Sequence, residues 1–404
     1  MATKLTRDLT PLDVNSATGD MLAHAARDKL RKKFDDMLIV DIDAHVSESA
    51  FWDEVTDFIP SDVWRYNAKS FKDRGNANGL SNSQPGLLYQ NVFGRVPHSG
   101  VTREQIPAGV HKQAALARRA MDAMGIDYMT VFPTAMLTLG VHPQPEVEIE
   151  IGRAYNRWLT EKVLPSDPGL LGLLYLPFNT PEACAPMVEE FGDKPGVIGF
   201  TVTSTRYKPV HHNAYMRLYR TLEERGLPLA FHAGFNWEDG SMAQLNRFLS
   251  MHALSFVHCN LVHMANWVIN GLPERFPNLK VIWVESGLAW LPYLMQRLDS
   301  EYMMRTSEAP LLKRKPSEYI TEMYYTTQPM ERGHPKLLEA TLEAIKAETQ
   351  LLYASDWPHW DFDTPSTIYD LKFLTEGQKR NILGGNAARL FNLKDPYQAK
   401  AAAE

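Results

Sequence analysis

The most constraining feature of this sequence is a repeated pattern in which a short apolar run, a turn and a longer amphipathic stretch follow one another. Most of the apolar runs are continuous rather than alternating, which is typical of parallel strands covered on both faces. Eight such units favour a closed (β/α)8 TIM barrel over an open doubly wound sheet. The predicted strands cover 38–43, 128–133, 170–177, 197–202, 227–232, 281–285, 323–327 and 351–355.

The segments between these runs predict the outer helices of the barrel, which is expected to occupy residues 37–395. An N-terminal arm, 1–36, is polar and partly helical over 21–34, and 396–404 form a tail. No G-x-G-x-x-G motif follows any predicted strand, which excludes the dinucleotide-binding class. The predicted helices cover 112–124, 146–163, 181–191, 214–225, 261–276, 289–304, 335–347 and 376–391.

One connection is much longer than the others. Residues 46–127 separate the first two predicted strands, and 68–109 are rich in Gly, Ser, Asn and Pro. Because long loops at the carboxyl end of a barrel strand are often functional, we predict a lid or substrate-shaping insertion. A partner-contacting or floppy insert is the alternative. Arg65 and Arg103 in this insertion are candidates to bind a substrate carboxylate, with a solubilising surface role as the alternative.

Composition excludes several function classes. The formal net charge of −6 and a pI near 6.1 give no electrostatic reason to bind nucleic acid or an anionic membrane. No apolar run approaches the roughly 18 residues of a membrane span, and no secretory signal is recognisable. Two cysteines, Cys184 and Cys259, predict no disulfide framework, so a reducing cytoplasm is the expected location.

Acidic and imidazole side chains gather at the ends of the apolar runs. Asp41, Asp43 and His45 alternate along the first run, so a strand would place them on one face. Other runs end in His232, Glu285 and Asp356, the last with His359 three residues later. Strand ends of a parallel barrel meet at one mouth, and buried unpaired carboxylates are costly. A divalent cation held by these residues explains the pattern.

The chain resembles the amidohydrolase-related family of metal-dependent barrels, the group typified by aminocarboxymuconate-semialdehyde decarboxylase and the resorcylate-type decarboxylases. The resemblance extends from about Leu38 to Phe391. Its most specific elements are an E-R-F-P-x-L-K segment within 271–280 and an L-P-Y-x-x-x-R-x-D segment over 291–299. The other matching segments are D-A-H at 43–45, F-H-A-G at 231–234, S-D-W-P-H at 355–359 and N-A-A-R-L-F at 386–391.

The resemblance implies roles for individual residues. Asp43 and His45 match the paired ligands of the family's first strand, His232 matches its fifth-strand ligand, and Asp356 matches its eighth-strand aspartate. The sequence departs from the family at Glu285, which stands where many members have a histidine followed by two glycines. The predicted site is therefore richer in carboxylate than the decarboxylases, which weakens a direct transfer of their mechanism.

The leading hypothesis is a single Zn or Mn ion held by Asp43, His45, His232 and Asp356. Such an ion lowers the pKa of a coordinated water to roughly 7, and Glu285 is a plausible general base for it. This chemistry would hydrolyse a C–N or C–C bond, or promote loss of CO2, in a small carboxylated substrate. Four tryptophans follow predicted strand ends, and we expect them either to line an aromatic substrate pocket or to pack in the protein core: Trp237, Trp290, Trp357 and Trp360.

Two alternatives stay open. Asp41, Glu285 and a further histidine could hold a second ion, and oxygen-rich ligands would favour Mn or Fe in a dinuclear oxygenase. The chain could also be a non-catalytic subunit paired with an active homologue. The resemblance implies a dimer or tetramer, whereas the subunit alternative implies an oligomer with a homologous chain. A small-molecule substrate is the other expected partner.

Overall fold

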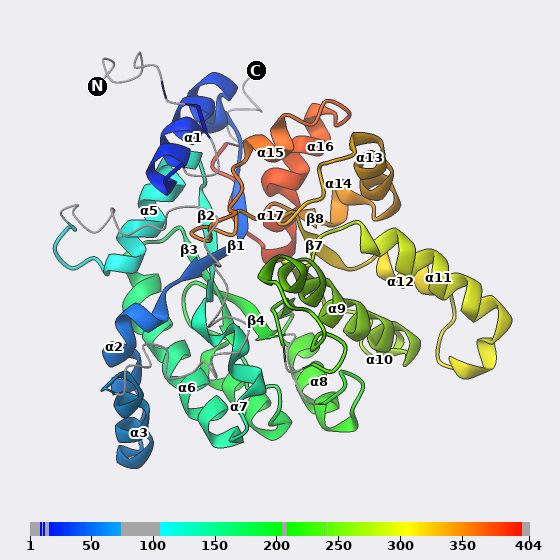
Figure 1. The fold of residues 1–404 in the computed structure, drawn as a ribbon, viewed down its shortest axis with the longest axis horizontal. Helices are drawn as coiled ribbons and strands as arrows, with labels where there is room; N and C mark the ends of the chain where they lie inside the picture. Colours follow the sequence, from blue (N-terminus) through cyan, green and yellow to red (C-terminus); the bar gives the residue numbers. More distant parts are fainter. Residues whose placement is uncertain are drawn as a thin grey trace.

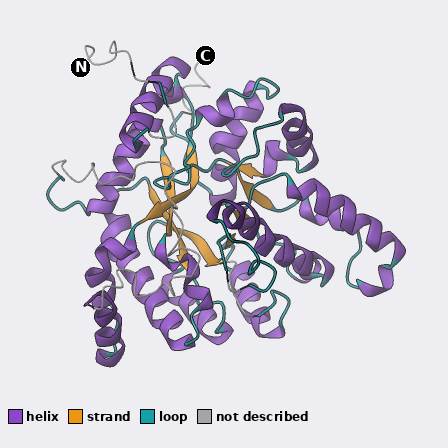
Figure 2. Ribbon diagram, in the orientation of Figure 1, coloured by secondary structure: helices purple, strands orange, loops and turns teal. Residues whose placement is uncertain are grey.

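The computed structural model describes residues 16–73, 106–203, 208–237 and 239–397, together with 9, 11 and 12. Eight strands form one sheet in the order β1 to β8, every neighbouring pair is parallel, and helices surround the sheet (Figures 1 and 2). The strands are β1 (Val40–Val46), β2 (Tyr128–Pro133), β3 (Leu170–Tyr175), β4 (Val197–Thr203), β5 (Leu229–His232), β6 (Val281–Val284), β7 (Tyr324–Thr326) and β8 (Leu351–Leu352).

The sheet closes on itself between the segment after β8 and β1. The backbone N–H of Ile42 donates to the carbonyl of Tyr353 at 2.9 Å, and that of His45 donates to the carbonyl of Trp357 at 2.7 Å. Ala44 forms a parallel bridge with Trp357. The predicted (β/α)8 barrel is therefore confirmed, and the carboxyl ends of all eight strands share one mouth.

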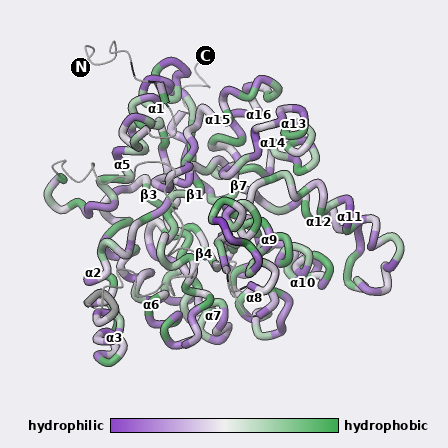
Figure 3. The backbone as a smooth tube through the Cα atoms, viewed as in Figure 1, coloured by the Kyte–Doolittle hydropathy of each residue, from purple (hydrophilic) through white to green (hydrophobic). Residues whose placement is uncertain are grey.

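The helices lie outside the sheet, and along them hydrophobic and hydrophilic segments alternate (Figure 3). None of the helices in the described ranges combines the length and apolar character that crossing a bilayer requires. The helices are α1 (Thr18–Lys32), α2 (Trp52–Asp57), α3 (Asp62–Asp73), α5 (Lys112–Met124), α6 (Pro145–Trp158), α7 (Pro181–Phe191), α8 (Met216–Glu224), α9 (Phe248–Ile269), α10 (Leu272–Arg275), α11 (Trp290–Met304), α12 (Pro316–Ile320), α13 (Pro335–Ala344), α14 (Ala347–Gln350), α15 (Ser366–Tyr369), α16 (Glu376–Arg380) and α17 (Asn386–Phe391).

Strand β8 is shorter than its predicted range, 351–355, because side chains replace part of its backbone ladder. The N–H of Ala354 donates to the hydroxyl of Thr327 at 2.9 Å, and the N–H of Ser355 donates to the carboxylate of Asp41, also at 2.9 Å. These bonds satisfy the backbone without a regular strand partner. They also fix the path of the chain just before Asp356.

Helix α9 differs most from the prediction, which placed one helix over 261–276. It begins thirteen residues earlier, at Phe248, and ends at Ile269, and α10 is a separate helix. Gly271 lies between them with φ 69°, a left-handed conformation that favours glycine and interrupts the helix. Leu249 and Leu254 are exposed while other apolar residues are buried, so no polar face marks where α9 begins.

The long connection after β1 contains α2 and α3. Residues 74–105, and with them Arg103 and most of the predicted lid, lie outside the described residues. The guanidinium of Arg65 donates to the carbonyls of Ile59 at 2.9 Å and Pro60 at 3.2 Å. Arg65 thus ties α3 to the preceding turn, which does not support its predicted role in binding a substrate.

The π-helical turn Asn381–Gly385, which precedes α17, packs against β1 and β8. Gly384 is buried in this turn, and a Cβ there would overlap the carbonyl oxygen of Leu38, which is backbone and cannot swing away. Gly384→Ala is expected to lower the free energy of unfolding by about 1–3 kcal/mol, the usual cost of overpacking. A Cβ at Gly377, in α16, would meet only open space, so this residue serves as the control.

Gly377→Ala should leave stability unchanged or raise it slightly, because alanine favours the helix over glycine. Thermal unfolding of both variants measures the difference. Equal melting temperatures for the two would show that the turn relaxes around the added methyl group.

Candidate metal centre

Five buried side chains from four strands meet at the mouth of the barrel. Asp43 and His45 lie within β1, His232 is the last residue of β5, Glu285 directly follows β6, and Asp356 follows β8. All five are at most 3% exposed. The structure thus brings together five of the six side chains that the sequence singled out, although they are distributed over most of the length of the chain.

The donor atoms lie at the distances expected around a metal ion. The Nε2 atom of His45 is 3.4 Å from Asp43 Oδ1 and 3.2 Å from Asp356 Oδ1. The Nε2 atom of His232 is 3.4 Å from Asp43 Oδ1 and 3.6 Å from Glu285 Oε2. Ligands about 2.1 Å from a tetrahedral ion are separated by about 3.4 Å. Asp43, His45, His232 and Glu285 each offer one atom to such a common point.

The same atoms lack hydrogen-bond partners. Within the described residues, this holds for both carboxylate oxygens of Asp43 and Asp356, for Oε2 of Glu285, and for Nε2 of His45 and His232. Burying charged oxygens without partners costs several kcal/mol each. One divalent cation would satisfy an atom each of Asp43, His45, His232 and Glu285 at once, so this donor set fits a metal ion.

Both histidines are oriented by their other ring nitrogen. His45 Nδ1 is 3.0 Å from the carbonyl oxygen of Pro133, and His232 Nδ1 is 2.8 Å from that of Ala233. A carbonyl only accepts hydrogen bonds, so each Nδ1 carries the proton and each Nε2 directs a lone pair at the cluster. This backbone support is the usual arrangement behind metal-binding histidines.

Protons compete with a cation for the cluster. Burial disfavours a charged ring at His45, but contacts with the carboxylates of Asp356 and Asp43 outweigh it and raise the pKa of His45 to about 10. Burial, with repulsion from Asp356 and Asp43, raises the pKa of Glu285 well above its usual value. A cation would have to displace these protons, so metal binding is expected to release protons and to weaken at low pH.

Two of the acids are held in an uncommon backbone conformation. Glu285 has φ 56° and Asp356 has φ 61°, both in the left-handed region that non-glycine residues seldom adopt. Such residues cost about 1–3 kcal/mol and cluster at functional sites. The N–H of Glu285 donates to the hydroxyl of Thr326 at 3.0 Å, which helps to hold the first turn. The same uncommon conformation thus occurs at two of the residues that supply carboxylates to the cluster.

Asp41, the sixth predicted residue, is not brought into the cluster. It accepts hydrogen bonds from the N–H and hydroxyl of Ser355, at 2.9 and 2.5 Å, and from the N–H of Asp43 at 3.2 Å. Burial raises the pKa of Asp41 to about 8. Its oxygens are therefore occupied in joining β1 to the segment after β8, and its predicted role at a second ion stays a prediction.

His359 was not among the predicted ligands, yet it lies in the site. Its Nδ1 is 2.7 Å from Asp356 Oδ1, and its ring lies over that of His45 with the centroids 4.1 Å apart. Asp356, His359 and His45 form a second group whose atoms could hold an ion. Its spacing from Asp356 in the sequence is the signal that could have identified it.

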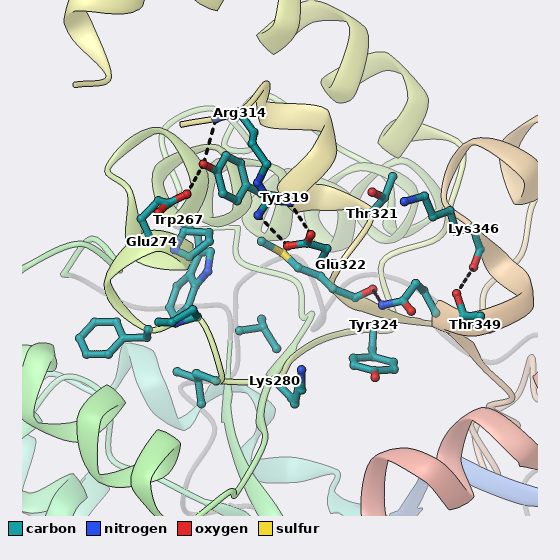
Figure 4. A pocket seen from close by; sticks show the side chains of 17 residues that line it. Trp267, Glu274, Lys280, Arg314, Tyr319, Thr321, Glu322, Tyr324, Lys346 and Thr349 are labelled. Carbon is teal, nitrogen blue, oxygen red and sulfur yellow. Dashed lines mark hydrogen bonds and ion pairs between the residues drawn. The ribbon is translucent and has the colours of Figure 1, made fainter. Parts of the chain in front are cut away.

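A cavity of about 600 Å³ lies at the opposite end of the barrel, beside the first residues of β6 and β7 (Figure 4). Both acidic side chains that line it form ion pairs, Glu274 with Lys313 and Glu322 with Arg314. Arg314 donates to Glu322 through its two terminal nitrogens, Nη1 and Nη2, and the hydroxyl of Tyr319 donates to Glu274. Because these charges are already compensated, the cavity does not compete with the cluster as the candidate active site.

Comparison with known proteins places the chain in a family. The amidohydrolase family profile matches residues 40–393. A gamma-resorcylate decarboxylase of Polaromonas sp. (strain JS666) is 26% identical over 285 residues, which cover 68% of this chain and 86% of that protein. A 2-amino-3-carboxymuconate-6-semialdehyde decarboxylase of Dictyostelium discoideum is 20% identical over 270 residues, covering 66% and 73%.

Solved structures share the fold. A dihydroxybenzoic acid decarboxylase from Polaromonas sp. JS666, with bound manganese and the inhibitor 2-nitroresorcinol, superposes with a TM-score of 0.61 at 20% identity, covering 88% of this chain and 97% of that one. A 5-carboxyvanillate decarboxylase from Sphingomonas paucimobilis gives 0.63 at 19% identity, covering 89% and 100%. The match over most of the barrel shows that the chain belongs to the amidohydrolase family of metal-dependent enzymes.

Proposed function

We propose that this protein is a manganese-dependent decarboxylase of a small aromatic carboxylic acid. The observation that carries the metal dependence is the set of buried donor atoms without hydrogen-bond partners on Asp43, His45, His232, Glu285 and Asp356. Carboxylate-rich sites favour Mn over softer ions. Decarboxylation is favoured because the relatives matched by sequence are decarboxylases. Manganese is favoured because a related solved structure contains it. Hydrolysis, the first expectation from the sequence, stays a prediction.

When bound, the cation would supply Lewis acidity and a positive charge that attracts the substrate carboxylate. Loss of CO2 breaks the bond between the ring carbon and the carboxyl carbon, and the electron pair stays with the ring carbon. A proton must therefore reach that same carbon. We assign this proton to Glu285, because burial and the neighbouring carboxylates of Asp356 and Asp43 raise its pKa and so favour its protonated form.

Glu285→Gln tests this assignment. Glutamine keeps the size and one oxygen of the side chain but cannot exchange a proton. If Glu285 transfers the proton, the rate of CO2 release from hydroxybenzoates should fall by about a hundredfold or more while manganese is retained. If Glu285 is mainly a ligand, the manganese content measured by mass spectrometry should fall as well. An unchanged rate would contradict both roles.

A dinuclear oxygenase is the second candidate, and the observation that favours it is His359. The group formed by His45, Asp356 and His359 lies beside the first group and shares His45 with it. Two ions per chain, one of them iron, together with consumption of dioxygen would support this reading. One ion per chain and CO2 release without dioxygen would support the decarboxylase.

A further inference from the structure

We propose that Trp360 and His252 form a wall that binds the planar ring of the substrate beside the metal centre. The inference deepens the proposed function and rests on it, since it assumes that the substrate carboxylate lies at the cation. The juxtaposition that carries the inference is a pair of ring contacts, His45 with His359 and His252 with Trp360, joined because His359 and Trp360 are adjacent in the chain.

The first of these contacts begins inside the cluster. The ring of His45 lies over His359, and Trp360 is the next residue along the chain. The Trp360 ring meets that of His252, from α9, with the centroids 5.6 Å apart and the planes at 54°. His252 in turn contacts Phe256 at 4.6 Å. The rings therefore extend from the buried centre to the surface of the mouth.

Trp360 is exposed although it belongs to a tightly held turn. Its side chain is 37% exposed. The turn is fixed by hydrogen bonds from the N–H of His359 to the carbonyl of Asp356, at 2.9 Å, and from the N–H of Asp363 to the carbonyl of Ser355, at 2.8 Å. The indole is thus held in place with part of its surface open to a ligand.

The ring of His252 contacts Phe248, which packs against a small, separate apolar cluster. Trp237, Met242 and Met251 form this cluster, and Phe235 and Phe248 pack against it. Phe248 contacts the His252 ring with the centroids 5.4 Å apart. Burial lowers the pKa of His252, so the ring facing Trp360 is neutral near pH 7. A neutral imidazole beside an indole suits a planar ring that carries hydroxyl groups, because it offers both a flat face and a hydrogen bond.

The wall predicts an effect on substrate binding rather than on the chemical step. In the manganese-loaded full-length protein, Trp360→Leu should raise KM for 2,6-dihydroxybenzoate by about three- to tenfold and change kcat by less than about twofold. Trp360→Phe, which restores a flat ring, should recover most of the affinity. Tyr66→Leu is the matched control, because Tyr66 is an aromatic residue on α3 that is 77% exposed and takes no part in the contact between Trp360 and His252.

A second readout separates this inference from the proposed function. Calorimetric titration of 2-nitroresorcinol, an inhibitor of a related enzyme that has no carboxyl group to lose, into each manganese-loaded variant measures a Kd without turnover. If the wild-type protein releases CO2 but Trp360→Leu has an unchanged KM and Kd, the wall is overturned and the decarboxylase stands. If the wild-type protein neither binds nor decarboxylates hydroxybenzoates, the proposed function fails and the wall fails with it.

Discussion

His232→Ala and Asp356→Ala are each expected to abolish tight metal binding and to lower turnover by at least about a thousandfold. Each substitution removes a buried side chain that offers a ligand atom to one of the two candidate metal-binding groups, and the remaining ligands cannot close the coordination shell. The fold should survive, because the barrel core does not depend on these side chains. Metal content per chain, the rate of CO2 release and circular dichroism measure the three effects.

His258→Ala is the control for the two ligand variants. His258 also lies on a helix near the mouth, but its Nε2 bonds the hydroxyl of Ser241 at 3.0 Å and it belongs to neither metal-binding group. It should keep both metal and activity. Full turnover in His232→Ala or Asp356→Ala would refute the site. No metal in the wild-type protein and no effect of Asp356→Ala would instead favour the non-catalytic subunit.

Much of the barrel could be predicted because its strands are covered on both faces, so each one is a continuous apolar run. The predicted ends of strands and helices are least accurate where tertiary contacts, and not the local sequence pattern, decide where an element begins or ends. The side chains of Thr327 and Asp41 take backbone donors that a longer β8 would have used. The early start of α9 was missed because apolar residues occur on its exposed side as well.

The cluster could be predicted from the sequence because the carboxyl ends of parallel strands converge on one mouth. Strand alternation alone, however, could not separate Asp41 from Asp43, since it places both on the same face. What separates them is Ser355, which lies 314 residues away and binds Asp41. His359 follows Asp356 by three residues, which is a signal in the sequence, but the turn closed by its N–H and the carbonyl of Asp356 is what brings its ring back to the site.

Removal of the metal is expected to lower stability measurably. Without a cation, the carboxylates of Asp43, Glu285 and Asp356 remain buried and close together with no counter-charge beyond the histidines. An ion present at a hundred times its Kd stabilises the folded state by about 2.7 kcal/mol. Chelation should therefore lower the melting temperature by about 5 °C, and manganese should restore it.

Asp356→Ala provides the matched comparison, because its melting temperature should not respond to manganese. The manganese-dependent shift of the wild-type protein should shrink as the pH falls, since protons compete with the ion at His45 and at the carboxylates. A chelated wild-type protein that melts at the same temperature as the manganese-loaded one would mean that the buried acids are neutralised by protons alone. The convergence of these side chains would then be a feature of the fold rather than a metal centre.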